Sequence, residues 1–354
     1  MVGRVMITLE RDSLVFRFPE VHEQAQTEVN FQRTLRIPDN GKHYPLPPGL
    51  GSFSLKHLED FADRIPAAWS ECGGVMMPLY QAEAMWLSFC GGRRSGTYPF
   101  ALKIAAGKIN AVSGKSWKPD LDASERDYVV VPGQPWLDGF CVAKDVVRQF
   151  VAMPLGSGYS VEEQITGKPE HGGLQIITYP MKSESYAELE RERAARLKDR
   201  SCLRDTSSFV GAPMRARAAA PAQAMGLAAG GRMHQQIYAD PYGIDAWDQS
   251  ASSRCFVTLL DATQWREITG EAPAQRPPTA TDYTNAGLPW FDYYAEAETL
   301  PGAKELALVK SVAELAAEKG EQVLGPDGEV EPGNVVQLGP GKRAKSRPVR
   351  ESRL

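Results

Sequence analysis

The chain has 354 residues, 42% of them hydrophobic and 24% charged, an ordinary composition for a soluble globular protein of about two domains. Its formal net charge is −4, yet residues 341–354 hold six basic side chains and one acid, so the remainder is acidic and poorly suited to nucleic acid. No apolar run reaches the roughly 18 residues needed to span a bilayer, and five scattered cysteines without a C-x-x-C pair argue against a zinc knuckle or a disulfide framework.

Short apolar or alternating runs, broken by Gly and Pro, predict a β-rich domain over residues 1–182. A helix is expected at residues 55–63, with Ser54 as its N-cap. The spacing favours an antiparallel sandwich or open barrel over a βαβ arrangement. The predicted strands are residues 5–18, 31–37, 75–80, 85–89, 100–112, 128–131, 146–153, 161–165 and 174–179.

Residues 183–224 read as a connector: charge pairs three and four apart predict a helix over 183–201, and an Ala/Pro-rich linker follows. Residues 225–319 predict a smaller mixed domain, with strands at 232–238 and 255–260 and helices at 261–269, 279–286 and 303–319. Residues 320–354 lack periodicity and read as a disordered basic tail. The fold class expected is therefore α+β and β-rich.

The most informative stretch is residues 146–175, because it sets charged residues among apolar ones. Alternation places Arg148 in one apolar row and Glu163 in another, so a hairpin would bring them together as a guanidinium–carboxylate pair. A buried ion pair that fixes strand register is the structural interpretation. A ligand-facing cluster, with Gln149 and Gln164 as hydrogen-bonding partners, is the functional one.

A rigid turn at residues 133–140 adds Trp136 and Asp138, an aromatic platform beside an acid. Asp138 with Glu163, and with Glu162 nearby, could supply the carboxylates of a hydrolytic site. Lys103 interrupts a row of small residues and could stabilise negative charge beside Arg148. The catalytic candidates are thus Asp138, Glu163 and Arg148, and the ligand-binding candidates are Trp136, Gln149, Gln164 and Lys103. The lone His171 in its turn reads as a surface residue.

Two glycine-containing motifs lack the neighbouring residues or helix that a nucleotide-binding loop requires. The GKS at residues 114–116 lacks the phosphate-loop glycine at position 109, and the Gly-rich residues 225–233 lead into a strand instead of a helix. The five histidines lack metal-ligand spacing, so we predict no metal and no cofactor. Aromatic residues 287–296 are expected to dock the C-terminal helix, with a sugar or peptide platform as the alternative.

Several segments, NFQRT (30–34), PWLDGF (135–140), RQFVAMPLGSGYSVEEQITG (148–167), GGLQ (172–175), WREITGE (265–271) and GLPWF (287–291), resemble a group of bacterial and fungal proteins with no established function. The resemblance covers most of the chain outside the linker and the basic tail. It implies no activity, cofactor or site residue.

These observations favour a non-catalytic binding or assembly protein, because β-structure and aromatic turns are abundant and catalytic motifs are not. The alternative is a cofactor-free, hydrolase-like enzyme that uses carboxylates near Arg148. The partners are open: self-association into a homo-oligomer fits a β-rich surface, and only residues 341–354 could contact nucleic acid or an anionic surface weakly. The first residues lack the apolar core of a secretory signal, so we expect a cytoplasmic protein.

Overall fold

The computed structural model describes residues 7–89, 98–197, 223–324 and 330–338, and two large sheets dominate it. The ten-stranded sheet runs in the order β1 (Ile7–Glu10), β2 (Ser13–Arg17), β3 (Gln26–Thr34), β8 (Ala84–Ser88), β14 (Val146–Pro154), β16 (Met225–His234) and β4 (His43–Tyr44), with β5 (Gly49–Ser52) on β3, β12 (Trp136–Leu137) on β8 and β13 (Gly139–Ala143) on β14.

The second sheet has seven strands, in the order β10 (Ile109–Asn110), β9 (Phe100–Ala106), β15 (Leu174–Pro180), β17 (Ser253–Asp261), β7 (Val75–Leu79) and β6 (Lys56–His57), with β11 (Val129–Val131) on β9. Within the described residues, neither sheet closes into a barrel. Most pairings are antiparallel, and β16 with β4 and β17 with β7 are parallel. The predicted β-rich α+β class is therefore confirmed.

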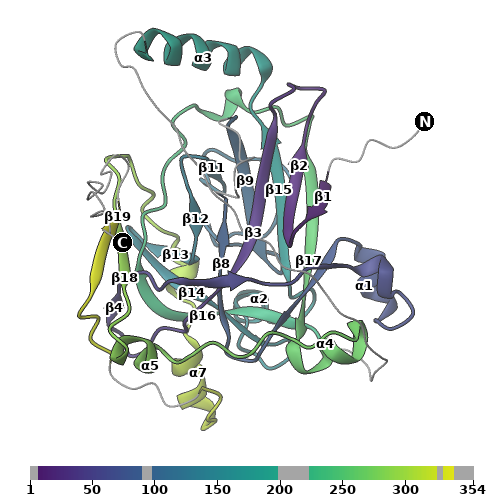
Figure 1. Ribbon diagram of the computed structural model, residues 1–354, viewed down its shortest axis with the longest axis vertical. Coiled ribbons are helices and arrows are strands. Elements are labelled where there is room, and N and C mark those ends of the chain that lie inside the picture. The colour runs from purple at the N-terminus through teal and green to yellow at the C-terminus, as the bar shows by residue number, and fades with distance from the viewer. Residues whose placement is uncertain (1–6, 90–97, 198–222, 325–329, 339–354) are drawn as a thin grey trace, which may run out of the picture.

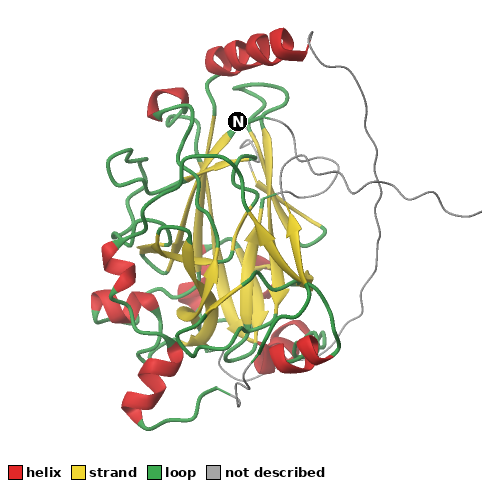
Figure 2. Ribbon diagram, turned by 90° about the vertical axis from the view of Figure 1, so that its left-hand side faces the viewer, coloured by secondary structure: helices red, strands yellow, loops and turns green. Residues whose placement is uncertain are grey.

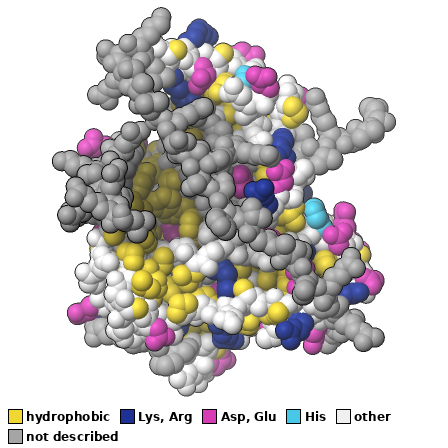
Figure 3. Space-filling view, in the orientation of Figure 1, with side chains coloured by type: hydrophobic (Ala, Val, Ile, Leu, Met, Phe, Trp, Pro, Cys, Tyr) yellow, Lys and Arg dark blue, Asp and Glu magenta, His cyan; other side chains and the backbone are white. Residues whose placement is uncertain are grey.

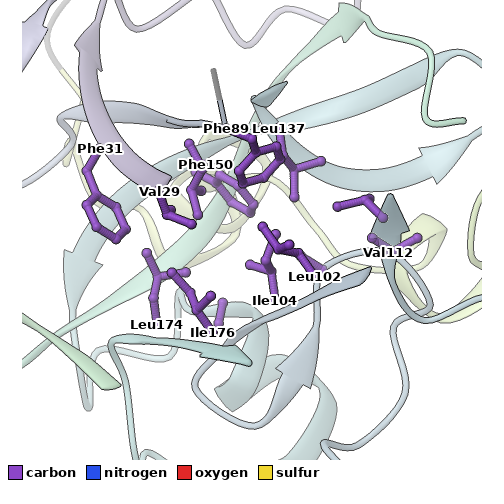
Figure 4. Packing of buried hydrophobic residues seen from close by; sticks show 14 of the residues in the cluster. Val29, Phe31, Phe89, Leu102, Ile104, Val112, Leu137, Phe150, Leu174 and Ile176 are labelled. Atoms are coloured by element: carbon purple, nitrogen blue, oxygen red, sulfur yellow. The ribbon is translucent and has the colours of Figure 1, made fainter. Parts of the chain in front are cut away.

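The core lies between the two sheets. Figure 4 shows Val29, Phe31 and Phe150 of the larger sheet pointing toward Ile104 and Ile176 of the smaller one. All five side chains are almost completely buried. Alternation along each strand sends the remaining side chains to the outer faces, where a ligand could reach them.

Helices surround the sheets, as Figure 2 shows, with the long α3 at one end of the molecule. They are α1 (Ala67–Cys72), α2 (Val161–Thr166), α3 (Ser183–Leu197), α4 (Ala262–Thr269), α5 (Ala280–Asn285), α6 (Lys304–Ala307) and α7 (Val312–Lys319), with 3₁₀ turns η1 (Leu58–Phe61) and η2 (Ile244–Ala246). The helices predicted at 261–269 and 279–286 are confirmed, capped by the side chains of Asp261 and Thr279.

Three local predictions were wrong. Residues 161–166 form a helix, because Ser160 and Glu163 make a capping box that starts one there. Residues 55–63 hold only β6 and η1, without a side-chain cap. The helix expected over 303–319 is interrupted, because Ser311 caps a new helix, and Leu308 is left 84% exposed.

The strands of the predicted C-terminal domain do not form a sheet of their own. Strand β16 pairs with β14 and β17 pairs with β15, so each lies inside one of the two large sheets. Part of the predicted tail is also ordered into a strand, since β19 (Val335–Leu338) pairs in parallel with β18 (Trp290–Tyr293). Residues 339–354, which include the basic segment, and most of the predicted linker lie outside the described residues.

Candidate functional site

Arg148 is buried beside a carboxylate, but the carboxylate is not the predicted one. Its guanidinium lies 3.3 Å from Glu314 of α7, with only 5% of the Arg148 side chain exposed. Glu163 instead completes the cap of α2, accepting hydrogen bonds from the backbone N–H of Gly158 at 2.8 Å and from the Ser160 hydroxyl at 2.7 Å. The predicted pairing of Arg148 with Glu163 was wrong because residues 161–166 are helical.

The two glutamines predicted to bind a ligand instead form hydrogen bonds that hold parts of the fold together. Gln149 accepts from the Ile37 N–H at 3.0 Å and donates to the Leu35 carbonyl at 2.8 Å, so it ties β14 to the chain after β3. Gln164 makes two hydrogen bonds with the backbone of Lys310 and thereby joins α2 to the start of α7. Since their polar atoms satisfy buried or bridging backbone groups, neither side chain is free for a ligand.

Lys103 also has a structural partner. Its ammonium group forms an ion pair with Asp127, both side chains being at least 97% buried, and it donates to the Asp120 carbonyl. The ring of Trp117 lies 5.8 Å from the same charge. The charge of Lys103 is therefore neutralised within the smaller sheet, whereas Arg148 belongs to the larger sheet.

Asp138 is buried without a cationic partner among the described residues. Burial raises the pKa of its carboxyl to about 7, and a hydrogen bond from the Trp136 side chain opposes this rise. Gln235 holds the residue at both ends, donating to the Asp138 carboxyl at 2.7 Å and accepting from its N–H at 2.9 Å. Such a perturbed acid is typical of functional sites, although it also occurs in structural networks.

Trp136 belongs to a set of three contacting aromatic rings, which we call the aromatic row: Trp86, Trp136 and Tyr293. The centroids of Trp86 and Trp136 lie 6.4 Å apart and those of Trp136 and Tyr293 lie 4.9 Å apart, both in edge-to-face geometry. Each is partly buried. Alternation puts Trp86 opposite the core-facing Met85, so the row lies on the outer face of the larger sheet.

A polar set, the amide row of Asn30, Gln32 and Ser52, lies on the same face. Gln32 is the cross-strand neighbour of Trp86 and donates to the Ser52 hydroxyl at 2.9 Å. The Ser52 hydroxyl in turn donates to the Asn30 side-chain oxygen at 3.0 Å. These contacts fix the amides and leave the side-chain oxygen of Gln32 without a donor among the described residues.

Gly49 lies against the aromatic row. A side chain at this position would place its first carbon 3.2 Å from the Trp86 ring and 3.3 Å from the Gln32 side-chain oxygen, so these two side chains would have to shift by a few tenths of an ångström to admit it. Figure 3 shows hydrophobic side chains gathered in a recessed area between the β18–β19 pair and strands β8 and β12.

Glu162 and His171 form a further pair that the sequence does not predict. The carboxylate accepts from His171 Nδ1 at 3.1 Å and from the backbone N–H groups of Lys108, His171 and Gly172 at 2.8 to 3.2 Å. Glu162 is buried and the His171 side chain is 30% exposed. The glycines at 107, 172 and 173 were the available signal, since each has positive φ and they bring backbone N–H groups close to the acid.

Within the described ranges, no cluster of three His, Cys, Asp or Glu side chains is arranged to hold a metal ion. Among the same residues, no helix is both long and apolar enough to cross a membrane. Comparison with family models, curated proteins and solved structures found no match for the chain.

Proposed function

We propose that the protein is a non-catalytic binding protein, and that the aromatic row and the amide row together hold an oligosaccharide. The supporting observation is that three contacting aromatic rings, contributed by β8, β12 and β18, share one sheet face with a fixed row of amide and hydroxyl groups. A sugar ring has apolar C–H faces and a rim of hydroxyls. Aromatic rings cover the first, and the side-chain oxygen of Gln32 can accept a hydrogen bond from the second.

The position of the aromatic row is fixed before any ligand arrives. The Trp136 carbonyl accepts hydrogen bonds from Gln134 at 2.9 Å and from Gln235 at 3.2 Å, so β12 is anchored on both sides. A rigid aromatic surface loses little conformational entropy on binding, which favours recognition of a flexible sugar chain.

The test is a titration of tryptophan fluorescence with oligosaccharides of β-linked glucose, xylose and N-acetylglucosamine. We expect saturable quenching or enhancement with at least one of them, and an affinity about 2- to 10-fold weaker in Trp136→Ala, from the loss of about 0.5–1.5 kcal/mol of stacking. Trp69→Ala, on the short helix α1, is the matched control. No change with any of the three sugars would refute the proposal.

Glu162 and His171 support a second candidate, a cofactor-free hydrolase. The carboxylate accepts from Nδ1 of His171, which leaves Nε2 with the free lone pair, and His171 lines a cavity of about 520 Å³ together with Gln175 and Arg254. Burial raises the pKa of the nearby Cys255 thiol to about 12, so water would be the nucleophile. This keeps the hydrolase alternative but moves its residues away from Arg148.

That candidate predicts hydrolysis of p-nitrophenyl esters above the buffer rate, abolished in His171→Ala and reduced in Glu162→Gln. His22→Ala, which alters a histidine stacked on Tyr98, is the control and should leave the rate unchanged. A wild-type rate equal to that of His171→Ala eliminates the hydrolase.

We also propose that the protein self-associates and that it is cytoplasmic. Strand β19 exposes Val335, Val336 and Leu338 to between 39% and 43%, and an apolar edge of this kind favours pairing with a second copy. Light scattering after size-exclusion chromatography would show a discrete oligomer that Val336→Lys dissociates; a monomeric wild type would rule this out.

The free, buried thiols of Cys141 and Cys255 support the cytoplasm as the compartment.

A further inference from the structure

Two arginines lie directly opposite each other on the larger sheet. Arg148 of β14 and Arg232 of β16 are cross-strand partners in an antiparallel register, so both side chains leave the same face. Like charges in this position destabilise a sheet. A negative charge between the two arginines would relieve this repulsion.

The described part of the protein supplies that charge incompletely. The nearest acceptors for the Arg148 guanidinium are the Glu314 oxygens, at 3.3 and 3.5 Å, which are long for a charge-assisted hydrogen bond. Half of the Glu314 side chain is exposed. Arg232 forms no hydrogen bond or ion pair with any described residue.

Asp39 is close by, but its carboxylate is already committed. It accepts from the N–H of Ala313, in the first turn of α7, at 3.0 Å, and interacts with the Ser311 side chain. Burial raises the pKa of this carboxyl, which further limits its value as a counter-ion. Asp39 caps the helix and does not neutralise Arg232.

Two histidines lie beside Arg232, and burial together with the charges of His234 and Arg232 lowers the pKa of His43. His43 of β4 is the register partner of Arg232, and His234 follows Arg232 by two positions, so both share its face. Their ring centroids lie 5.3 Å apart. The two imidazole rings thus lie next to the arginine pair at one end of β14, β16 and β4.

The two arginines, without the histidines, border a cavity of about 320 Å³ that Asn40, Asp39 and Glu314 also line. A volume of this size lies at the lower end of the range for small-molecule sites and exceeds what a bare ion needs. Two guanidinium groups present parallel N–H donors that match the oxygens of a phosphate. With Glu314 displaced, the two guanidinium charges outweigh the one remaining carboxylate of the cavity, Asp39, and so favour an anion such as a phosphate monoester.

We propose that this cavity is a binding site for a phosphate group, carried by free phosphate or by a small phosphorylated molecule, held between Arg148 and Arg232. Glu314 is the competing internal ligand of Arg148 and is displaced by the phosphate. The site lies against α7 and is separate from the aromatic row, so it extends the proposed function instead of restating it.

Calorimetric titration of the full chain with inorganic phosphate and with glycerol 3-phosphate, at constant ionic strength, tests this proposal. We expect saturable binding that weakens at least tenfold in Arg148→Met and in Arg232→Met. Glu314→Gln should bind several-fold more tightly, because glutamine keeps the capping box of α7 while removing the competing charge. Arg191→Met, on the exposed face of α3, should bind as the wild type does.

The two ligands distinguish the sources. Tighter binding of glycerol 3-phosphate identifies a phosphorylated small molecule, and equal binding identifies the free anion. The proposal is overturned if neither ligand binds, if sulfate binds as tightly as phosphate, or if Glu314→Gln weakens binding. Should Arg148→Met fail to fold by circular dichroism, the partly exposed Arg232→Met decides the question alone.

Discussion

At the scale of single residues, Asp138 makes stability depend on pH. Its folded-state pKa of about 7 exceeds the ordinary value of 3.8, so the folded state binds a proton that the unfolded chain releases between those values. The free energy of unfolding should therefore fall as pH rises from about 4 to 7, by up to about 1.4 kcal/mol per unit from this group, and level off above.

Urea unfolding at pH 5 and pH 7.5 checks this, with Asp138→Asn as the comparison. The variant cannot ionise and retains an oxygen for Gln235 to donate to, so its loss of stability across the interval should be smaller. Equal losses in both proteins would contradict the assignment.

Lys103 and Asp127 give a second residue-level prediction. Removing one member of a buried ion pair leaves an uncompensated charge, so Lys103→Met should lower the free energy of unfolding by about 3–5 kcal/mol. The double variant Lys103→Met/Asp127→Asn should recover part of that loss, because the remaining group is neutral. Denaturant unfolding of the three proteins measures both effects, and additive losses in the double variant would show that the pair is not coupled.

The sequence could indicate that Arg148 is buried beside a carboxylate, but not which carboxylate. Alternation within β14 marks the arginine as an intrusion in an apolar strand, which the structure confirms. Its partner Glu314 is 166 residues away, on a helix whose docking no local pattern specifies. Arg232 was overlooked for the same reason, since only sheet register places it opposite Arg148.

At the scale of elements, turn geometry controls how α2 meets the β9–β10 turn. Gly107 and Gly41 both have positive φ, so alanine at either site should cost about 1–2 kcal/mol of stability. A side chain at Gly107 would also collide with the Glu162 carboxylate, whereas Gly41 has open space. We expect Gly107→Ala to be the more destabilising by about 1–3 kcal/mol, measured by urea unfolding. Equal costs would show that the carboxylate moves away freely.

Caps explain which helices the sequence could predict. Asp261 with Gly270, and Thr279, mark their helices by local chemistry alone, and the structure confirms both. In residues 160–166 the two apolar residues, Val161 and Ile165, lie four apart, which fits one face of a strand as well as one face of a helix, so the capping box of Ser160 was overlooked. The local sequence is compatible with a strand and with a helix, and the packing of α2 against β16 stabilises the helix.

At the scale of the whole molecule, the two sheets tie the ends of the chain together. Strands β16 and β17 lie between strands from residues 1–182, and removing them would open both sheets. We therefore expect one cooperative unfolding transition, coincident by circular dichroism and fluorescence, and no folded state for residues 1–182 alone. Two separated transitions would show that the parts fold independently.

We propose that the outer face of the larger sheet binds a sugar chain. The decisive experiment is calorimetric titration of wild type and Trp136→Ala with the oligosaccharide that gives the strongest fluorescence response. We expect one binding event in the wild type and a clear loss of affinity in the variant, with both proteins equally folded by circular dichroism. Identical isotherms for the two proteins would show that the aromatic row does not bind the sugar.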